Sequence, residues 1–220
     1  MTLIIGIFIR DIHDKKEILF ASDGLAVEYK DNKIIAQYED VEKIRKLTPK
    51  ICIGYAGKNS ELFEDVFDEL NNKTPKKIKK ELDPFAKSLQ LAILKMLKTK
   101  KHKMIEKELM ERNQLFHKFI VGGVFNSKLI LIRANSDNNY EISPEEVAPA
   151  ILDINLYVAG STEEIQKETL VILEKKIKLI RSDDEMEIII KDTISEIAEL
   201  YRNALNNHVF IRRLSRNFNS

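Results

Sequence analysis

The amino-terminal segment Leu3-Ile-Ile-Gly-Ile-Phe-Ile9 and the segment Glu17-Ile-Leu-Phe-Ala-Ser22 that follows it set the class of fold. Both are rich in β-branched and aromatic residues, a composition typical of strands. The polar residues Asp11–Lys16 between them are typical of a turn, so the pair predicts a β-hairpin. Asp23-Gly24 then ends the second strand with two turn-forming residues. We therefore expect an antiparallel sheet at the start of the chain.

Further strands are predicted before and after a helical middle third. Short apolar runs bounded by turn residues indicate strands, and apolar residues at helical spacing indicate helices. The predicted strands are Leu25–Val27, Lys33–Gln37, Ile51–Gly57, Phe119–Val124, Lys128–Ala134, Ile154–Ala159 and His208–Leu214. The predicted helices begin at the Asn59-Ser60 cap, at Asp83-Pro84 (continuing to Leu109), at Gly160-Ser161 and at Ser182, and residues 135–150 are predicted to form a loop.

The order of these elements predicts the architecture. Strands, two helices, strands, two helices and a last strand follow one another in blocks, which favours an α+β fold over alternating parallel units. Two antiparallel sheets between two helical layers would bury every apolar face. We therefore predict a four-layer αββα sandwich. Because the 220 residues contain no linker rich in Gly, Ser or Pro, we expect one domain over residues 1–220.

Composition excludes several classes of protein. Hydrophobic residues make up 44% of the chain and charged residues 32%, with a formal net charge of +1, which excludes a disordered chain and a global field that attracts nucleic acid or a membrane. Cys52 is the one cysteine, so an intramolecular disulfide and a thiolate zinc site are excluded. Apolar runs are shorter than a membrane span and no signal pattern is seen. We expect a soluble cytoplasmic protein without metal or cofactor.

Residues 73–118 form a basic segment, with 14 Lys and Arg against five Asp and Glu. Such an excess is compatible with a nucleic-acid contact. The segment lacks interleaved aromatic residues and any recognised nucleic-acid module, so we favour a solvated helix pair at the edge of a subunit.

Thr2 is the first candidate for chemistry. Removal of Met1 would leave its α-amino group free, with a pKa of about 7.7–8.0, so that a useful fraction is neutral at physiological pH. The amine can take the proton of the hydroxyl on the same residue, and Thr2 would then be both nucleophile and base. Many proteins begin with Met-Thr by chance, and the dipeptide alone leaves both interpretations open.

Three further residues have a structural and a chemical interpretation. Asp23 either initiates the Asp23-Gly24 turn or orients the terminal amine or a nearby lysine. Lys43 is one of several cations between residues 33 and 50; beside Asp23 it would lower the pKa of the hydroxyl, but periodicity does not choose which cation points inward. Gly54 lies inside a strand, where glycine marks a bulge or the close approach of a ligand, and its N–H would serve an oxyanion.

Other polar residues receive no role from their pattern. Ser161 and Glu164 form a capping box, which explains that serine without catalysis. The four histidines show no metal-ligand spacing and fall in predicted turns or on polar faces, and none is assigned a function: His13, His102, His117 and His208.

Taken in order, a set of short motifs resembles the proteasome β-subunit family, and especially the bacterial proteasome-like, ATPase-dependent threonine peptidases. The motifs are Thr2-Leu-Ile-Ile-Gly6, Ile18-Leu-Phe-Ala-Ser-Asp-Gly24, Val41-Glu-Lys-Ile-Arg-Lys-Leu47, Ile51-Cys-Ile-Gly-Tyr-Ala-Gly57, Ile120-Val-Gly-Gly-Val124 and Val158-Ala-Gly-Ser161. They span nearly the whole chain, and their order is more specific than any one of them.

The resemblance implies a site. It assigns Thr2 as the amino-terminal nucleophile, Asp23 as the supporting carboxylate and Lys43 as the catalytic lysine. Gly54 would supply the oxyanion N–H and Ser161 would match the serine near the nucleophile. Cys52, on the strand face of Gly54, would lie at the floor of the pocket for the residue before the scissile bond.

The chain departs from the family after the last long helix. Many β subunits have Arg-Asp-x-x-Ser-Gly there, whereas this chain has Arg202-Asn-Ala-Leu-Asn-Asn207. If Asn203 and Asn206 occupy the aspartate and serine positions, a charge that supports the terminal amine is missing.

The resemblance implies a peptidase that acts through an acyl-enzyme, needs only removal of Met1 for activation, and becomes a transpeptidase where an amine replaces water. Its implied partners are peptide or unfolded-protein substrates, further copies of the chain in a ring, and an ATPase regulator. The alternative is a non-catalytic paralogue that serves as a structural ring subunit or binding scaffold.

Overall fold

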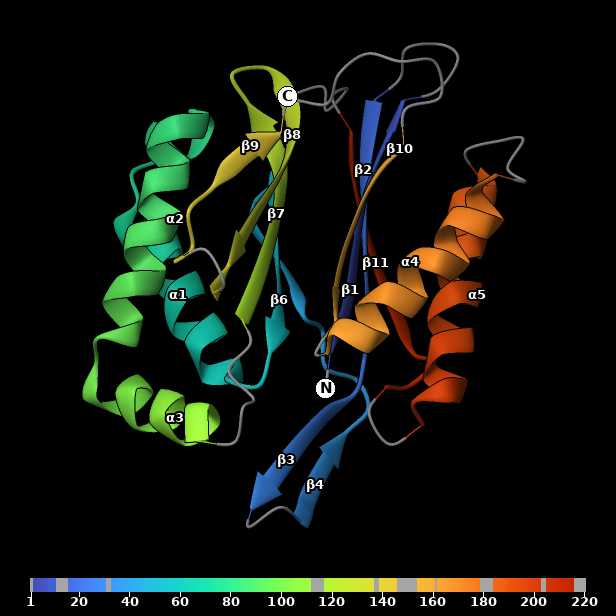
Figure 1. Cartoon of the computed structure of the whole chain (residues 1–220). Coiled ribbons are helices and arrows are strands. Elements are labelled where there is room, and N and C mark those ends of the chain that lie inside the picture. The colour runs from blue at the N-terminus through green and yellow to red at the C-terminus, as the bar shows by residue number, and fades with distance from the viewer. Residues whose placement is uncertain are drawn as a thin grey trace.

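The computed structural model describes residues 2–10, 16–30, 33–111, 117–136, 139–145, 154–160, 162–178, 184–202 and 205–215. They build two antiparallel sheets between helical layers (Figure 1). The first sheet has the order β10-β1-β2-β11, with β1 Leu3–Arg10, β2 Lys16–Asp23, β10 Ile154–Gly160 and β11 Val209–Ser215. The second has the order β5-β6-β7-β8-β9, with β5 Ile44–Thr48, β6 Ile51–Gly57, β7 His117–Phe125, β8 Lys128–Asn135 and β9 Ser143–Glu145.

Helices cover the outer face of each sheet (Figure 1). The second sheet carries α1 (Ser60–Lys73), α2 (Leu82–Leu97) and α3 (Lys100–Glu111), with a short 3₁₀ helix at Ile78–Lys80; the first carries α4 (Glu163–Ile177) and α5 (Asp184–Leu200). A separate two-stranded hairpin, β3 (Ala26–Lys30) and β4 (Lys33–Tyr38), extends away from the sandwich. The predicted αββα sandwich of class α+β is confirmed.

Successive side chains of β1 point to opposite faces of the sheet, and this explains why an unbroken apolar run forms a central strand. Leu3, Ile5 and Ile7 pack with α4 and α5 in one buried cluster. Ile4 and Phe8 point the other way, into the cluster between the two sheets. A third cluster joins the second sheet to α1 and α2. Both faces of β1 are therefore apolar because each faces a different core layer.

Gly122 of β7 allows the sheets to approach each other, and we expect Gly122→Ala to destabilise the fold. A Cβ at this position would lie 2.3 Å from Cε2 and 2.6 Å from Cζ of Phe20, whose ring is fully buried. Such overpacking costs about 1–3 kcal/mol. Urea unfolding measures it, with Gly6→Ala as the control, because a Cβ at Gly6 meets its nearest atom at 3.3 Å. Equal losses in the two variants would contradict this account.

Several predicted boundaries are wrong. The long second helix is two helices, because Thr99 interrupts it: its hydroxyl donates to the Met96 carbonyl at 2.8 Å and accepts from the His102 amide at 3.4 Å. The first of them begins after Glu81, so Asp83-Pro84 lies inside its first turn. The predicted loop over residues 135–150 contains β9.

The cap of the third predicted helix is displaced by one residue. Thr162 is the N-cap of α4, and its side chain accepts the Ile165 amide at 3.2 Å. The predicted cap, Ser161, lies outside the described residues, as does Ser182 at the predicted start of the last helix. The Asn59 cap of α1 is confirmed, since Asn59 Oδ1 accepts the Leu62 amide at 3.0 Å.

Candidate active site

The amino-terminal hairpin brings Thr2 and Asp23 together. Thr2 immediately precedes β1 and is 7% exposed, and Asp23 is the last residue of β2 and is fully buried. Asp23 Oδ1 accepts the amide N–H of Leu3, the residue after Thr2, at 2.7 Å, and Oδ2 accepts the amide of Leu25 at 3.1 Å. Main-chain donors on both sides of the carboxylate therefore hold it beside the start of the chain.

Lys43 reaches the same carboxylate from the other sheet. It precedes β5, and its Nζ lies 2.8 Å from both oxygens of Asp23. Lys43 is 7% exposed, and this burial lowers the pKa of its ammonium below 10.5, although Asp23 opposes part of the change. Lys43, one of the cations between residues 33 and 50, is therefore buried and in contact with Asp23.

Gly54 and Cys52 lie on the face of β6 that looks into the space between the sheets. Gly54 pairs with Ile44, the residue after Lys43, and a Cβ at Gly54 would lie 3.1 Å from Cδ1 of Ile4. The glycine therefore sits where the strand of Lys43 and the strand of Thr2 approach each other. Cys52 is fully buried in the cluster between the sheets, and burial raises the pKa of its thiol to about 11.

Of the two asparagines and the serine in the predicted site, the structure describes Asn206 alone. Ser161 and Asn203 lie outside the described residues. Asn206 lies at the edge of the site, where its Oδ1 accepts the Gly24 amide at 2.9 Å and its Nδ2 donates to the Glu39 carbonyl at 2.9 Å. Asn206 therefore binds the main chain next to Asp23.

Two histidines without a predicted role are fully buried and bonded. His117 Nδ1 lies 2.6 Å from the Tyr55 hydroxyl and its Nε2 lies 2.6 Å from Oε1 of Glu106. His102 Nε2 lies 2.8 Å from Oδ2 of Asp65. The His102–Asp65 bond holds α3 to α1, and the His117–Glu106 bond holds α3 to β7. In the sequence, the burial of His117 was indicated by its position two residues before Phe119, which places both side chains on the same buried face of β7.

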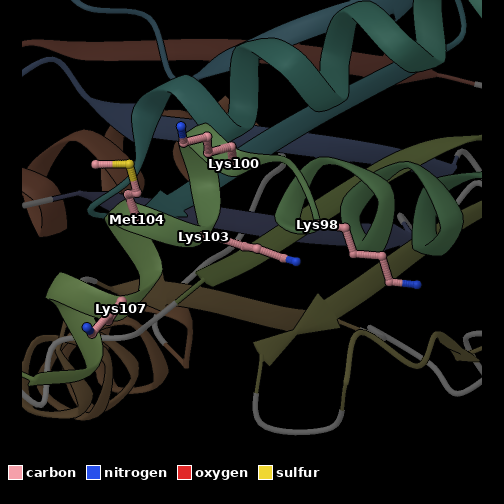
Figure 2. A pocket seen from close by; sticks show the side chains of 5 residues that line it. All are labelled: Lys98, Lys100, Lys103, Met104 and Lys107. Atoms are coloured by element: carbon pink, nitrogen blue, oxygen red, sulfur yellow. The ribbon is translucent and has the colours of Figure 1, made fainter.

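A surface hollow of about 440 Å³ lies away from these residues, on α3 and the residue that caps the C-terminus of α2. It is lined by Lys98, Lys100, Lys103, Met104 and Lys107. Figure 2 shows these lysine side chains fanning out instead of converging on one point. The described residues contain no group of three or more His, Cys, Asp or Glu side chains that could hold a metal ion. None of their helices has the length and apolarity to span a membrane.

No family model matches the sequence, and no curated protein sequence matches it either. Among solved structures, eukaryotic HslV from Trypanosoma brucei is similar, with a TM-score of 0.57 at 12% sequence identity, over 96% of this chain and 99% of that chain. HslV is a proteasome-like amino-terminal nucleophile hydrolase. The chain therefore shares the fold of HslV.

Proposed function

We propose that this chain is a threonine-type endopeptidase, an amide hydrolase whose nucleophile is Thr2 after removal of Met1. One observation carries the proposal: the buried carboxylate of Asp23 binds both the amide that follows Thr2 and the ammonium of Lys43. Buried charge pairs of this kind are expensive to desolvate and gather at functional sites. The likeness of fold to HslV supports the same assignment.

The proposed reaction forms and hydrolyses an ester. The Thr2 hydroxyl attacks the carbonyl carbon, its proton passes to the α-amine directly or through one water, and the amine then gives it to the leaving nitrogen. Lys43, paired with Asp23, lowers the pKa of the hydroxyl. The family resemblance assigns the oxyanion contact, a contribution of about 3–4 kcal/mol in related chemistry, to the Gly54 N–H. Water releases the acyl group, and an amine in its place gives transpeptidation.

The remaining roles follow the fold analogy. By this analogy we assign Ser161 as the serine that assists the nucleophile, Asn203 and Asn206 as supporting residues, and Cys52 as the floor of the pocket for the substrate residue before the scissile bond. Peptides or unfolded proteins are the substrates, copies of this chain form a ring around a chamber, and an ATPase feeds it. The chain acts as one domain in the cytoplasm.

Intact mass spectrometry before and after an amino-terminal-threonine-directed electrophile tests this function. We expect a mass that lacks Met1, and one adduct that peptide mapping places on Thr2. Retention of Met1 would acylate the amine and leave no internal base. That result would support the alternative, a non-catalytic ring subunit or scaffold, which the loss of the family aspartate charge at Asn203 also favours.

A further inference from the structure

Asn206 closes the base of the β3–β4 hairpin. The chain leaves the first sheet at Asp23-Gly24, runs out along the hairpin and returns through Glu39 to Lys43. At the base, the amide group of Asn206 bonds to the main chain of both Gly24 and Glu39, each at 2.9 Å. The Val41 amide also donates to the Gly24 carbonyl at 2.9 Å. The outgoing and returning chains are therefore joined next to Asp23 and Lys43.

The joint is tight and needs a side chain with both a donor and an acceptor. A Cβ on Gly24 would lie 2.6 Å from the Glu39 carbonyl oxygen, which shows how closely the two chains approach. In this joint the Gly24 N–H donates to the side-chain oxygen and the Glu39 carbonyl accepts from the side-chain nitrogen. A carboxamide meets both needs at once, whereas a carboxylate of the same size has no donor for the carbonyl.

We propose that Asn206 is a positioning residue for the proposed peptidase site: it fixes Asp23 relative to Lys43 by joining Gly24 to Glu39. Asn206 acts through the main chain and does not touch the reacting atoms. The inference rests on the proposed function for its effect on rate. Misplacement of a catalytic group by about 1 Å costs about 100-fold in rate. A loosened joint should therefore lower the rate constant of the chemical step.

The kinetic test compares Asn206→Ala and Asn206→Asp with the wild-type chain. We measure the rate constant of covalent reaction with the electrophile and, separately, its reversible binding constant. The rate constant is expected to fall about 10- to 100-fold in both variants, with the binding constant unchanged. Asn207→Ala is the matched control, because Asn207 is the exposed neighbour, and its rate constant should equal that of the wild type. Thermal unfolding confirms that each variant is folded.

Amide hydrogen exchange tests the same role without catalysis. Leu3 and Leu25 donate their amides to Asp23, so their exchange reports how firmly that carboxylate is held. Both variants are expected to exchange at least tenfold faster at Leu3 and Leu25. Gly24 should also exchange faster in Asn206→Ala, whereas the carboxylate of Asn206→Asp keeps an acceptor for the Gly24 amide.

Faster exchange confined to Gly24 would overturn the inference. If the wild-type chain reacts with the electrophile, a rate constant that is the same in the variants would overturn it too. If the wild-type chain does not react at all, the proposed function fails, and exchange at Leu3 still decides whether Asn206 positions Asp23. Asn206→Asp keeps the size of the side chain, so the exchange test remains available if Asn206→Ala does not fold.

Discussion

The Thr2→Ala variant is expected to lose covalent labelling by the electrophile and peptidase activity completely. The change removes the hydroxyl that attacks the carbonyl, while Asp23, Lys43 and Gly54 stay in place. Loss of the nucleophile lowers kcat on the order of 10⁶-fold in serine hydrolases. Alanine is small, so removal of Met1 is preserved. Labelling is measured by intact mass and activity by release of a fluorophore from a peptide amide.

Thr2→Ser is the matched control for this variant. Serine keeps the hydroxyl and the α-amine, so labelling and activity should persist at a reduced rate. Circular dichroism should be the same for both variants, because Thr2 precedes β1 and is not part of the strand. Labelling that persists in Thr2→Ala would place the nucleophile elsewhere in the chain and reject the site.

The sequence pattern was sufficient to predict the layers, whereas the pairing of Asp23 with Lys43 came from the family resemblance. Layers follow from local patterns: the unbroken apolar run of β1 and the hairpin that returns along β2 leave few ways to bury both faces. Lys43 was assigned by the resemblance, since periodicity did not select it from the neighbouring cations. The structure selects it physically, because its ammonium lies within 2.8 Å of both oxygens of Asp23.

The sequence was insufficient where contacts depend on segments far apart in the chain. Asn206 bonds to Gly24 and Glu39, which are more than 160 residues away in the sequence. The residues around Asn206 form no pattern that predicts those partners. His117 and Glu106 form a similar case, since a polar side chain appears solvated until its partner is placed. The break at Thr99 was missed because its hydroxyl bonds replace the helical ones without Gly or Pro.

Asp23→Asn is expected to remove activity and also to destabilise the fold. The substitution keeps the shape and one acceptor but removes the carboxylate charge that lies 2.8 Å from the buried Lys43 ammonium. Breaking a buried ion pair by neutralising one partner costs about 3–5 kcal/mol. Activity is expected to fall about 10²- to 10⁴-fold, the range for a group that controls proton transfer. Urea unfolding at pH 7 and peptide hydrolysis measure the two effects.

The pH dependence of this loss has a definite sign. Burial already lowers the pKa of Lys43 in the folded wild-type chain, and without the Asp23 charge it falls further. The unfolded chain then binds more protons than the folded variant between that lowered pKa and about 10.5, so the stability of the variant rises with pH in this window. The gap to the wild type should narrow as the pH approaches 10.5. A gap that widens would contradict the assignment of Lys43 as the charged partner.

A second substitution separates the fold from the chemistry. Adding Lys43→Met to Asp23→Asn removes the buried cation and leaves an apolar chain of similar length, an exchange that is often neutral for stability. Most of the lost free energy of unfolding should therefore return, while activity should stay at the level of Asp23→Asn, because both groups that set the electrostatics at Thr2 are gone. If the double variant is as unstable as Asp23→Asn alone, the cost comes from the amides of Leu3 and Leu25 that Asp23 accepts. If activity returns with stability, the ion pair serves the fold and takes no part in activating Thr2.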